Sequence, residues 1–501
     1  MSLSVVHSRA KVGVQAPIVT VEVHLSNGLP SMSIVGLPEA AVKESKDRVR
    51  SAIMNSHFEF PDGRITVNLA PADLPKEGGR FDLAIAIGIL AASEQIPKDA
   101  LNEYEFLGEL ALTGDIRCIL GGLTASIASQ KDNRQLILPV ENAQEASLPK
   151  QATVYAAKSL LAVCAHLTGH TKLDQYQHDY SKDPISKSLC LSDVKGQFGA
   201  KRALEVAAAG AHNLLYFGPP GTGKTLLSNR LASILPPPTE EEALEIAAIQ
   251  SIVGLPLNWQ SRPFRAPHHT SSAVALVGGG SYPKPGEITL AHNGVLFLDE
   301  LPEFSRQVLD VLREPLESGS VLISRAAKQM VFPAQFQLIA AMNPTPGGYG
   351  ASDSRTKRYH PDQIKRYLAK LSGPFLDRID MHVEVPALPN EILSSSEISE
   401  SSADVMLRTQ QARQRQYQRQ QKSNAKLSNK EIEKFCILEA DQKLLMSQAM
   451  KQMKLSARSY HRILKVARTV ADMKELEKID SACLSEALGY RQLEQLLANI
   501  S

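Results

Sequence analysis

LYFGPPGTGKTLLSNRL (residues 215–231) sets a glycine-rich loop between an apolar strand and a helix. Gly218, Gly223, Lys224 and Thr225 fill the pattern G-x-x-x-x-G-K-[ST], in which glycines let the backbone curl so that its N–H groups point at phosphate oxygens. The N-terminus of the following helix also favours an anion. The stretch therefore predicts a phosphate-binding loop. Its expected contacts are Gly218, Pro219, Pro220, Gly221, Thr222, Gly223, Lys224 and Thr225.

A second motif, GVLFLDE, lies 75 residues beyond the loop lysine, counted from Lys224 to Asp299. Val295–Leu298 is expected to be a buried strand that delivers two carboxylates at its end. An apolar strand that ends in two acidic residues is often only a strand leaving the core. A phosphate loop upstream in the same domain makes the prediction of a catalytic role stronger. Lys224 would then reach the β- and γ-phosphates. Thr225 and Asp299 would hold Mg²⁺, and Glu300 would act on the attacking water.

Two further polar residues follow predicted core segments. LIAAMN is a strand candidate that ends in Asn343, which is suited to position water or sense the γ-phosphate. GPFLDRID contains Arg378, which could reach a neighbour's nucleotide. An arginine acting in this way would require a ring of subunits. The alternative for Arg378 is a salt bridge with Asp377 or Asp380.

Composition bounds the class of protein. The 501 residues are 43% hydrophobic and carry a formal net charge of +2, so nucleic-acid binding would have to come from local patches. The longest apolar run, Leu83–Ala92, is about half a membrane span and predicts a buried helix. The N-terminus does not look like a signal peptide. The cysteines form no CxxC pair, which predicts neither zinc nor disulfides and favours a cytoplasmic protein: Cys118, Cys164, Cys190, Cys436 and Cys483.

Three domains and two linkers are predicted. Residues 1–170 mix β-rich runs with helical runs, which is typical of an α+β domain, and the polar stretch 171–188 follows as a linker. In 189–387, apolar strand candidates alternate with helices, as in an α/β domain with a parallel sheet. A serine-rich joint, 388–402, leads to 403–501, which is predicted to be a helical bundle.

The order of phosphate loop, acidic strand, Asn strand, arginine and helical bundle resembles the AAA+ ATPases. PFRAPHHTSSAVALVGGGSYPKPGEITLAHNGVLFLDELPEF is similar to the magnesium-chelatase-related branch, and within it to the ComM/YifB family. The resemblance includes VGLPEAAVKESKDRVRSA and RITVNLAPADLPKEGGRFDLAIAIGIL in the first domain. It implies a Lon-protease-like first domain (ribosomal S5 domain 2-like), an AAA+ core with an insert in its second helix, and a C-terminal helical lid. It also implies ATP and Mg²⁺ as cofactors.

The same resemblance places two devices in the core. The segment Gly254–Gly286 would be the insert in the second helix. SGSVLISRAAKQMVF is expected to form a hairpin that points into the channel of a ring, with Arg325 and Lys328 touching the DNA backbone. The alternative is an exposed basic hairpin without a ligand.

Further site residues come from matching family segments. KLSARSYHRILKVARTVAD resembles the helix that carries the second sensor arginine, which gives Arg458 a role at the γ-phosphate, in its own subunit or a neighbour's. DVKGQFGAKRALEVAAAGAHN resembles the segment that holds adenine. The resemblance implies that residues 194–197 contact the base, with Val194 and Gln197 as the named binding residues.

A basic stretch in the last domain is a second candidate DNA surface. Residues 405–430 contain seven basic residues and no acidic one. Four of them recur at helical spacing and are expected to share one face that could follow a phosphate backbone. The alternative is a solvated basic helix. The four are Arg415, Arg419, Lys422 and Lys426, with Tyr417 among them.

Departures from two family patterns exclude two chemistries. Lon-like peptidases need a serine nucleophile and a lysine base, but alignment with PKEGGRFDL and LTGDIRCILGGLTAS puts Arg80 and Thr124 at those places. The first domain is therefore expected to be non-proteolytic and to serve ring assembly or DNA engagement. Some relatives carry cysteines after the Asn strand, whereas MNPTPGGYGASDSRTKRYH has none, so no structural zinc is expected.

Three functions follow as hypotheses. The first is a ring-forming, hexameric ATPase that moves single-stranded or branched DNA and promotes branch migration or unwinding in homologous recombination during natural transformation. Its partners would include recombination proteins, and it would not act at a membrane. The second is the motor subunit of a magnesium chelatase, which would need partner subunits and be indifferent to DNA. The third is a protein-remodelling ATPase. The residues alone indicate a Mg-ATPase.

Overall fold

The computed structural model describes most of the chain, and contacts divide it into two compact units. The described residues are 2–36, 44–178, 189–280, 283–325, 328–345, 367, 370–389, 399–453 and 455–493. The first unit comprises Met1–Pro184, Glu240–Trp259 and Ala326–Phe332. The second comprises Ile185–Thr239, Gln260–Arg325 and Pro333–Ser501.

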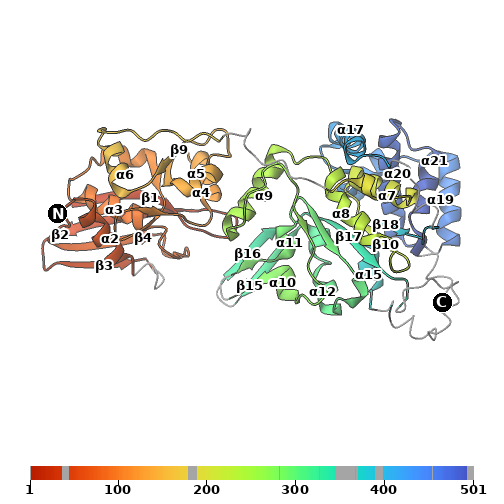
Figure 1. Cartoon of the computed structure of the whole chain (residues 1–501), viewed down its shortest axis with the longest axis horizontal. Helices are drawn as coiled ribbons and strands as arrows, with labels where there is room; N and C mark the ends of the chain where they lie inside the picture. The colour runs from red at the N-terminus through yellow and green to blue at the C-terminus, as the bar shows by residue number, and fades with distance from the viewer. Residues whose placement is uncertain are drawn as a thin grey trace. The chain divides into compact units, whose positions relative to one another are not determined.

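A mixed seven-stranded sheet in the order β3-β4-β2-β1-β5-β8-β9 forms the frame of the first unit (Figure 1). β2 pairs antiparallel with β1 on one side and with β4 on the other. The other pairs are parallel: β3 with β4, β1 with β5, β5 with β8, and β8 with β9. Alternate residues of β2 are fully buried, as expected of a sheet with one face on the core. The strands are β1 Ser2–Arg9, β2 Ile18–Ser26, β3 Ser31–Val35, β4 Arg64–Ala70, β5 Tyr104–Phe106, β8 Gln135–Pro139 and β9 Val154–Ala157, with β6 Glu109–Leu110 and β7 Ile116–Arg117 as a separate pair.

Helices of the first unit pack on this sheet. Every residue of α3 (Asp82–Ala92) is buried, which confirms the buried helix predicted for Leu83–Ala92. Gly88 lets α3 approach the sheet, because an added Cβ would lie 2.6 Å from Cγ2 of Val23. The other helices are α2 Ser45–Asn55, η1 Asp99–Glu103, α4 Gly122–Lys131, α5 Val140–Ala146, α6 Leu160–Leu167 and α9 Glu240–Val253.

The second unit is built on an all-parallel five-stranded sheet in the order β11-β14-β17-β10-β18 (Figure 1). The predicted strands NLLYFG, GVLFLDE and FQLIAAMN are confirmed as β10, β14 and β17, and all three are buried. The strands are β10 Leu214–Phe217, β11 Phe264–Arg265, β14 Val295–Leu298, β17 Gln337–Met342 and β18 Met381–Glu384.

Short helices and ribbons surround the sheet. Two strand pairs, β12 with β13 and β15 with β16, lie outside this sheet, although most of β16 is assigned to the first unit. The second pair confirms the predicted hairpin. The bounds are η3 Leu191–Asp193, α7 Phe198–Gly210, α8 Lys224–Ile234, α10 Ala273–Val277, β12 Gly278–Gly279, β13 Lys284–Pro285, α11 Glu287–Leu290, η4 Leu301–Glu303, α12 Arg306–Val311, α13 Pro315–Ser318, β15 Ser320–Arg325, β16 Lys328–Pro333 and α15 Gly373–Leu376.

The C-terminal part of the described chain is helical, as predicted, and shares one apolar core with the parallel sheet. Ile463, Val466 and Val470 of α20 belong to the same buried cluster as Leu214 and Tyr216 of β10. The sheet and the last helices are therefore stabilised together. The helices are α17 Ser402–Gln420, η6 Asn424–Lys426, α18 Asn429–Phe435, α19 Ala440–Gln452, α20 Ala457–Met473 and α21 Ser481–Gly489.

The structure corrects the interpretation of Gly254–Gly286 as wholly an insert. Phe264–Arg265 forms β11, which pairs with β14 and is therefore an edge strand of the core sheet. Before this strand, Glu240–Trp259 belongs to the first unit, and a separate excursion with α10 and the β12–β13 pair follows the strand. Within the described residues, no helix is both long and apolar enough to cross a membrane.

Candidate nucleotide-binding site

The glycine-rich loop joins β10 to α8, as the motif predicts, and its glycines have identifiable roles. Gly218 lies so close to β18's continuation that an added Cβ would be 2.3 Å from the carbonyl oxygen of Val385. Gly221 and Gly223 have φ values of 77° and 92°, in the left-handed region that favours glycine. An added Cβ at either would meet no atom within 4 Å. The loop is thus curled and open on that side, which fits a bound phosphate chain.

Lys224 is held across the loop. Its side chain is buried, and Nζ donates to the carbonyl oxygens of Gly218 at 2.8 Å and Pro219 at 2.7 Å. Burial lowers the pKa of this ammonium group, while the charge of Asp299 opposes that effect. An ammonium group bonded only to carbonyl oxygens here can exchange them for phosphate oxygens, so the residues present fit a nucleotide.

One contact brings the two main motifs together. The hydroxyl of Thr225, in the first turn of α8, donates to Oδ2 of Asp299 at 2.7 Å, although the residues are 74 positions apart. A hydroxyl and a carboxylate at this distance are the oxygen ligands that Mg²⁺ uses in nucleotide sites. The residues therefore fit a Mg²⁺ ion that accompanies the phosphates.

Glu300 is positioned by two neighbours. Its backbone has φ 51°, and its N–H donates to Oδ1 of Asp299 at 2.9 Å. Its carboxylate, which is more than half exposed, has Oε2 3.2 Å from Nδ1 of His269. The ring of His268 stacks on His269 with centroids 4.1 Å apart. Sequence reasoning missed His269; the signal that could have found it is the pair of histidines in APHH, just after β11 and hence beside the acidic strand.

Asn343 follows β17 directly, and β17 lies between β10 and β14 in the sheet. Met342 pairs with Phe217, the last residue before the phosphate loop. Because the three strands are parallel, Asn343 leaves the sheet at the same edge as the loop and Asp299. The half-buried Asn343 therefore lies at the sheet edge that also carries the phosphate loop and Asp299.

The expected adenine segment is tied to the phosphate loop. Gln197 has φ 54° and is buried, and its Nε2 donates to the carbonyl oxygens of Thr222 at 3.1 Å and Pro386 at 2.8 Å. Val194 is also buried, and its carbonyl accepts from Ser399 at 3.0 Å and from the ammonium of Lys201. Gln197 therefore connects the segment before α7 to the loop that carries the phosphates.

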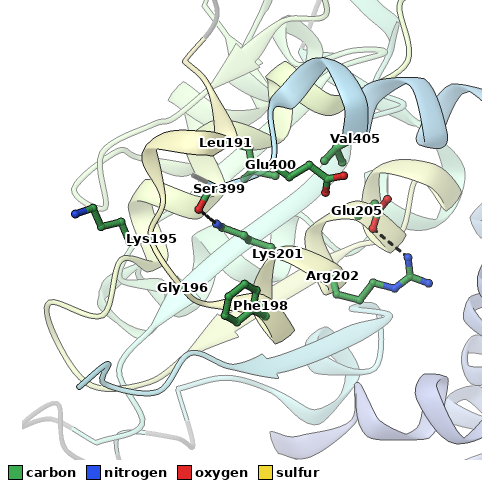
Figure 2. A pocket seen from close by; sticks show the side chains of 10 residues that line it. All are labelled: Leu191, Lys195, Gly196, Phe198, Lys201, Arg202, Glu205, Ser399, Glu400 and Val405. Carbon is green, nitrogen blue, oxygen red and sulfur yellow. Dashed lines mark hydrogen bonds and ion pairs between the residues drawn. The ribbon is translucent and has the colours of Figure 1, made fainter. Parts of the chain in front are cut away.

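A pocket of about 280 Å³ opens beside this segment (Figure 2). Lys195 and Gly196 line it, but none of Gly218–Thr225 does. Within it, Nζ of Lys201 donates to Oγ of Ser399 at 3.0 Å. The pocket thus adjoins the expected adenine segment but does not reach the phosphate loop.

Arg378 faces into its own unit. Its side chain is only 9% exposed, Nε donates to the carbonyl oxygen of Arg313 at 3.1 Å, and it forms an ion pair with Glu317. Asp380 pairs instead with Arg462 at 2.5 Å. Arg378 therefore forms a salt bridge, as the alternative prediction held, but its partner is Glu317 and not Asp377 or Asp380. Arg378 would have to leave Glu317 to reach a neighbour's nucleotide.

Arg458 is exposed in the first turn of α20, one turn before Arg462. The ion pair between Arg462 and Asp380 fixes that face of the helix against the loop before β18. Since residues i and i+4 share a helix face, Arg458 and Arg462 project from the same side. Arg325 and Lys328 are the last residue of β15 and the first of β16, and their side chains are outside the described set.

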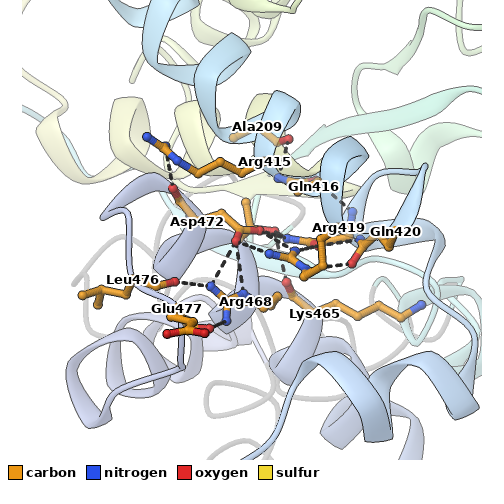
Figure 3. Close-up of polar contacts among 12 residues, drawn as sticks. Ala209, Arg415, Gln416, Arg419, Gln420, Lys465, Arg468, Asp472, Leu476 and Glu477 are labelled. Atoms are coloured by element: carbon orange, nitrogen blue, oxygen red, sulfur yellow. Dashed lines mark hydrogen bonds and ion pairs between the residues drawn. The ribbon is translucent and has the colours of Figure 1, made fainter.

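The prediction of one basic helical face in 405–430 is wrong. The helix α17 ends at Gln420, so Lys422 and Lys426 lie beyond it. Arg419 forms a two-fold contact with the buried carboxylate of Asp472, at 2.6 and 2.8 Å (Figure 3). Arg415 donates to the carbonyl oxygen of Asp472 at 3.0 Å and pairs with Glu475. Arg419 thus joins α17 to α20, which corrects its interpretation as a DNA contact.

The sequence is similar to those of known proteins along its whole length. The sequence is 54% identical over 510 residues to "Competence protein ComM" of Haemophilus influenzae, covering 100% of both chains. It is 51% identical over 506 residues to protein YifB of Escherichia coli, covering 100% of this chain and 99% of the other. The chain belongs to the ComM/YifB family.

Family models place this ComM/YifB protein within the magnesium-chelatase group. Residues 190–393 match "Magnesium chelatase, subunit ChlI", 21–142 match "Subunit ChlI of Mg-chelatase", and 399–491 match "Magnesium chelatase, subunit ChlI C-terminal". The "Magnesium-chelatase 38 kDa subunit" of Cereibacter sphaeroides is 26% identical over 195 residues, covering 32% of this chain and 55% of its own. The family implies use of ATP and Mg²⁺, whereas the prediction of no structural zinc stays a prediction.

Arg419→Ala should destabilise the C-terminal helices. Removing the guanidinium takes two charge-assisted hydrogen bonds from the buried Asp472 carboxylate, which keeps Arg468 as its other cationic partner, and should cost about 2 kcal/mol in the free energy of unfolding. Arg415→Ala, the matched control, loses an exposed pair worth about 0.5 kcal/mol. Chemical denaturation followed by circular dichroism would measure both. Equal losses would contradict the structural role of Arg419.

His269→Ala should lower kcat for ATP hydrolysis by about fivefold and leave KM for ATP nearly unchanged, because it removes the group that orients the Glu300 carboxylate. His268→Ala is the matched control, since Nδ1 of His268 lies 2.9 Å from the Thr270 hydroxyl and does not contact Glu300. Steady-state ATPase assays decide the matter. An unchanged kcat for His269→Ala would remove His269 from the site.

Proposed function

We propose that this ComM/YifB protein is a Mg-ATP hydrolase that moves single-stranded or branched DNA. It would act as a homo-oligomeric, hexameric ring in the cytoplasm, promoting branch migration or unwinding in homologous recombination during natural transformation. The contact of Thr225 with Asp299, which joins the phosphate loop to the acidic strand, is the observation that carries the ATPase part. The name of the Haemophilus relative, "Competence protein ComM", supports the competence part.

Each side chain then has a task in hydrolysis. Lys224 and the loop N–H groups would bind the β- and γ-phosphates, and Thr225 with Asp299 would hold Mg²⁺, which neutralises charge on the phosphates. Glu300, held by His269, would orient and deprotonate the attacking water. Asn343 leaves the same sheet edge and would fix that water.

The remaining proposed DNA contacts lie in the β15–β16 hairpin. Arg325 ends β15 and Lys328 begins β16, and both would bind phosphates of the DNA backbone. Arg415 has a half-exposed guanidinium that could add a contact at the end of α17, whereas Arg419 is excluded from this surface by Asp472. Binding of this kind weakens steeply with salt.

A second candidate is a chelatase-type motor. The 26% identity to the magnesium-chelatase 38 kDa subunit favours it, although that match covers only 32% of this chain. A motor of that kind would hydrolyse ATP at a rate indifferent to DNA. A protein-remodelling ATPase would likewise ignore DNA, but a protein client would stimulate it.

The test is the steady-state rate of ATP hydrolysis with and without single-stranded and forked DNA. Glu300→Gln serves as the blank, because it keeps the phosphate loop but removes the base, and Lys224→Ala should lose nucleotide binding itself. We expect DNA to stimulate the wild-type rate by about tenfold at moderate salt. A rate that DNA leaves unchanged at low and moderate salt would reject the DNA motor and favour the chelatase-type reading.

Arg378→Ala should abolish hydrolysis while nucleotide binding stays within about twofold, if this arginine leaves Glu317 to act on a neighbour's nucleotide. Glu317→Ala, the companion variant, frees Arg378 without removing it and should retain activity. Mixing Arg378→Ala with Lys224→Ala subunits should restore part of the rate, since each supplies what the other lacks. Normal hydrolysis by Arg378→Ala alone would refute the trans-acting role.

A further inference from the structure

α9 lies between two segments of the ATPase part of the chain but is built into the first unit. In sequence it follows α8, which begins with Lys224, and precedes β11, the strand paired with β14. Its residues nevertheless belong to the first unit, together with the rest of Glu240–Trp259. A segment connected at both ends to the nucleotide-binding unit is therefore part of the other unit's structure.

An apolar contact holds α9 against α4. Leu123 and Leu148 form one buried cluster with Ala247 and Ala248 of α9, and each of these side chains is at most 7% exposed. Alanines at the contact allow the two helix backbones to approach closely, and Trp259 packs at the margin of the same cluster. Burial of this kind is non-directional, so it holds α9 in place but does not set its register.

Polar contacts set the register. α4 begins after Gly121, which has no side chain to cap the helix. The carbonyl oxygen of Ser251 in α9 accepts the N–H of Gly121 at 3.0 Å, and its hydroxyl oxygen accepts the N–H of Leu123 at 3.4 Å. The buried carboxylate of Glu145 also hydrogen-bonds to Ser251 and to the N–H of Gly122. α9 thus supplies the cap that α4 lacks.

The loop before α4 also contacts the two positions at which a Lon-like peptidase would need its catalytic groups. Nη1 of Arg80 donates to the carbonyl oxygen of Leu120 at 3.3 Å, and the hydroxyl of Thr124 donates to the carbonyl oxygen of Gly121 at 2.9 Å. Ser251 binds Gly121 from α9. Structural contacts therefore occupy the place where peptidase chemistry would have to occur.

We propose that α9 stays docked on the first unit throughout the ATPase cycle and transmits movement of α8 to it, so that the first unit is a rigid arm of the motor. Undocking would leave the start of α4 uncapped, expose Ala247 and Ala248, and strip Glu145 of a hydrogen bond. The statement that the arm moves DNA rests on the proposed function. The docking of α9 on the first unit does not depend on that function.

A cross-link tests whether α9 stays docked. Lys150 and Glu240 face each other at the surface, with Nζ 2.7 Å from Oε2 and side chains 64% and 48% exposed. Lys150→Cys with Glu240→Cys, in full-length protein with the accessible Cys118 and Cys190 replaced by serine, can be joined by a short bis-maleimide. We expect ATP hydrolysis and DNA strand displacement to stay within about twofold of the same protein treated with N-ethylmaleimide. Loss of either activity on cross-linking alone would overturn the proposal.

A disrupting variant tests whether the docking transmits movement. Ala247→Glu places a charge in the contact with Leu123 and should lower strand displacement by at least about tenfold while ATP hydrolysis stays within about twofold. Ser251→Ala removes only the hydrogen bonds of the hydroxyl and keeps the carbonyl contact with Gly121, so it should fold more safely and show the same split to a smaller degree. Glu241→Ala, an exposed change on the same helix, is the control. Unchanged strand displacement in both variants would overturn the proposal.

A measurement without DNA separates this inference from the proposed function. Hydrogen exchange of the Glu300→Gln protein, with and without ATP, should show the amides of α9 and α4 equally protected in both states. Loss of protection in α9 alone on adding ATP would overturn the docking. If instead wild-type protein never moves DNA, the proposed function fails while the exchange result still decides whether α9 is held.

Discussion

The parallel pairing of β10, β17 and β14 is the constraint on which the nucleotide site depends. Phe217 pairs with Met342, and Leu298 pairs with Ala340, so the three strands end at the same edge of the sheet. No local feature of the sequence brings the phosphate loop, the acidic pair and the asparagine together; the hydrogen-bond register does. The side chains proposed to hold an ATP-bound Mg²⁺ thus depend for their position on the register of a buried sheet.

Buried carboxylates extend that order to the C-terminal helices. Oδ2 of Asp380 accepts the N–H of Asn213 before β10, while Oδ1 pairs with Arg462 of α20. Burial alone would raise the pKa of Asp380, but Arg462 and His212 outweigh this effect and hold it below its usual range. Asp472 similarly joins α17 to α20 through Arg419. Because each charge would be costly to leave unpaired, the sheet and helices keep one arrangement.

Regular patterns made much of this predictable from sequence. The strands of NLLYFG, GVLFLDE and FQLIAAMN and the helix at Leu83–Ala92 occur as expected, since continuous apolar runs have few other places to go. The contact between Thr225 and Asp299 follows once both motifs are placed on parallel strands. His269 was not found, because a histidine after an edge strand has no pattern until that strand is paired with β14.

Other features could not be predicted because their cause lies elsewhere in the chain. α17 ends at Gln420, and the next residue, Gln421, has φ 57°. A glycine usually occupies such a position and marks the helix end, but here the residue is glutamine. The sequence therefore predicted a helix that continued through Lys426. α9 is harder still. Its alanines and Ser251 indicate only a helix that packs closely against something. The partner becomes evident only in α4, which begins with glycine and needs a cap that its own residues do not supply. A serine 128 positions away meets that need, which is why this segment of the ATPase chain belongs physically to the first unit.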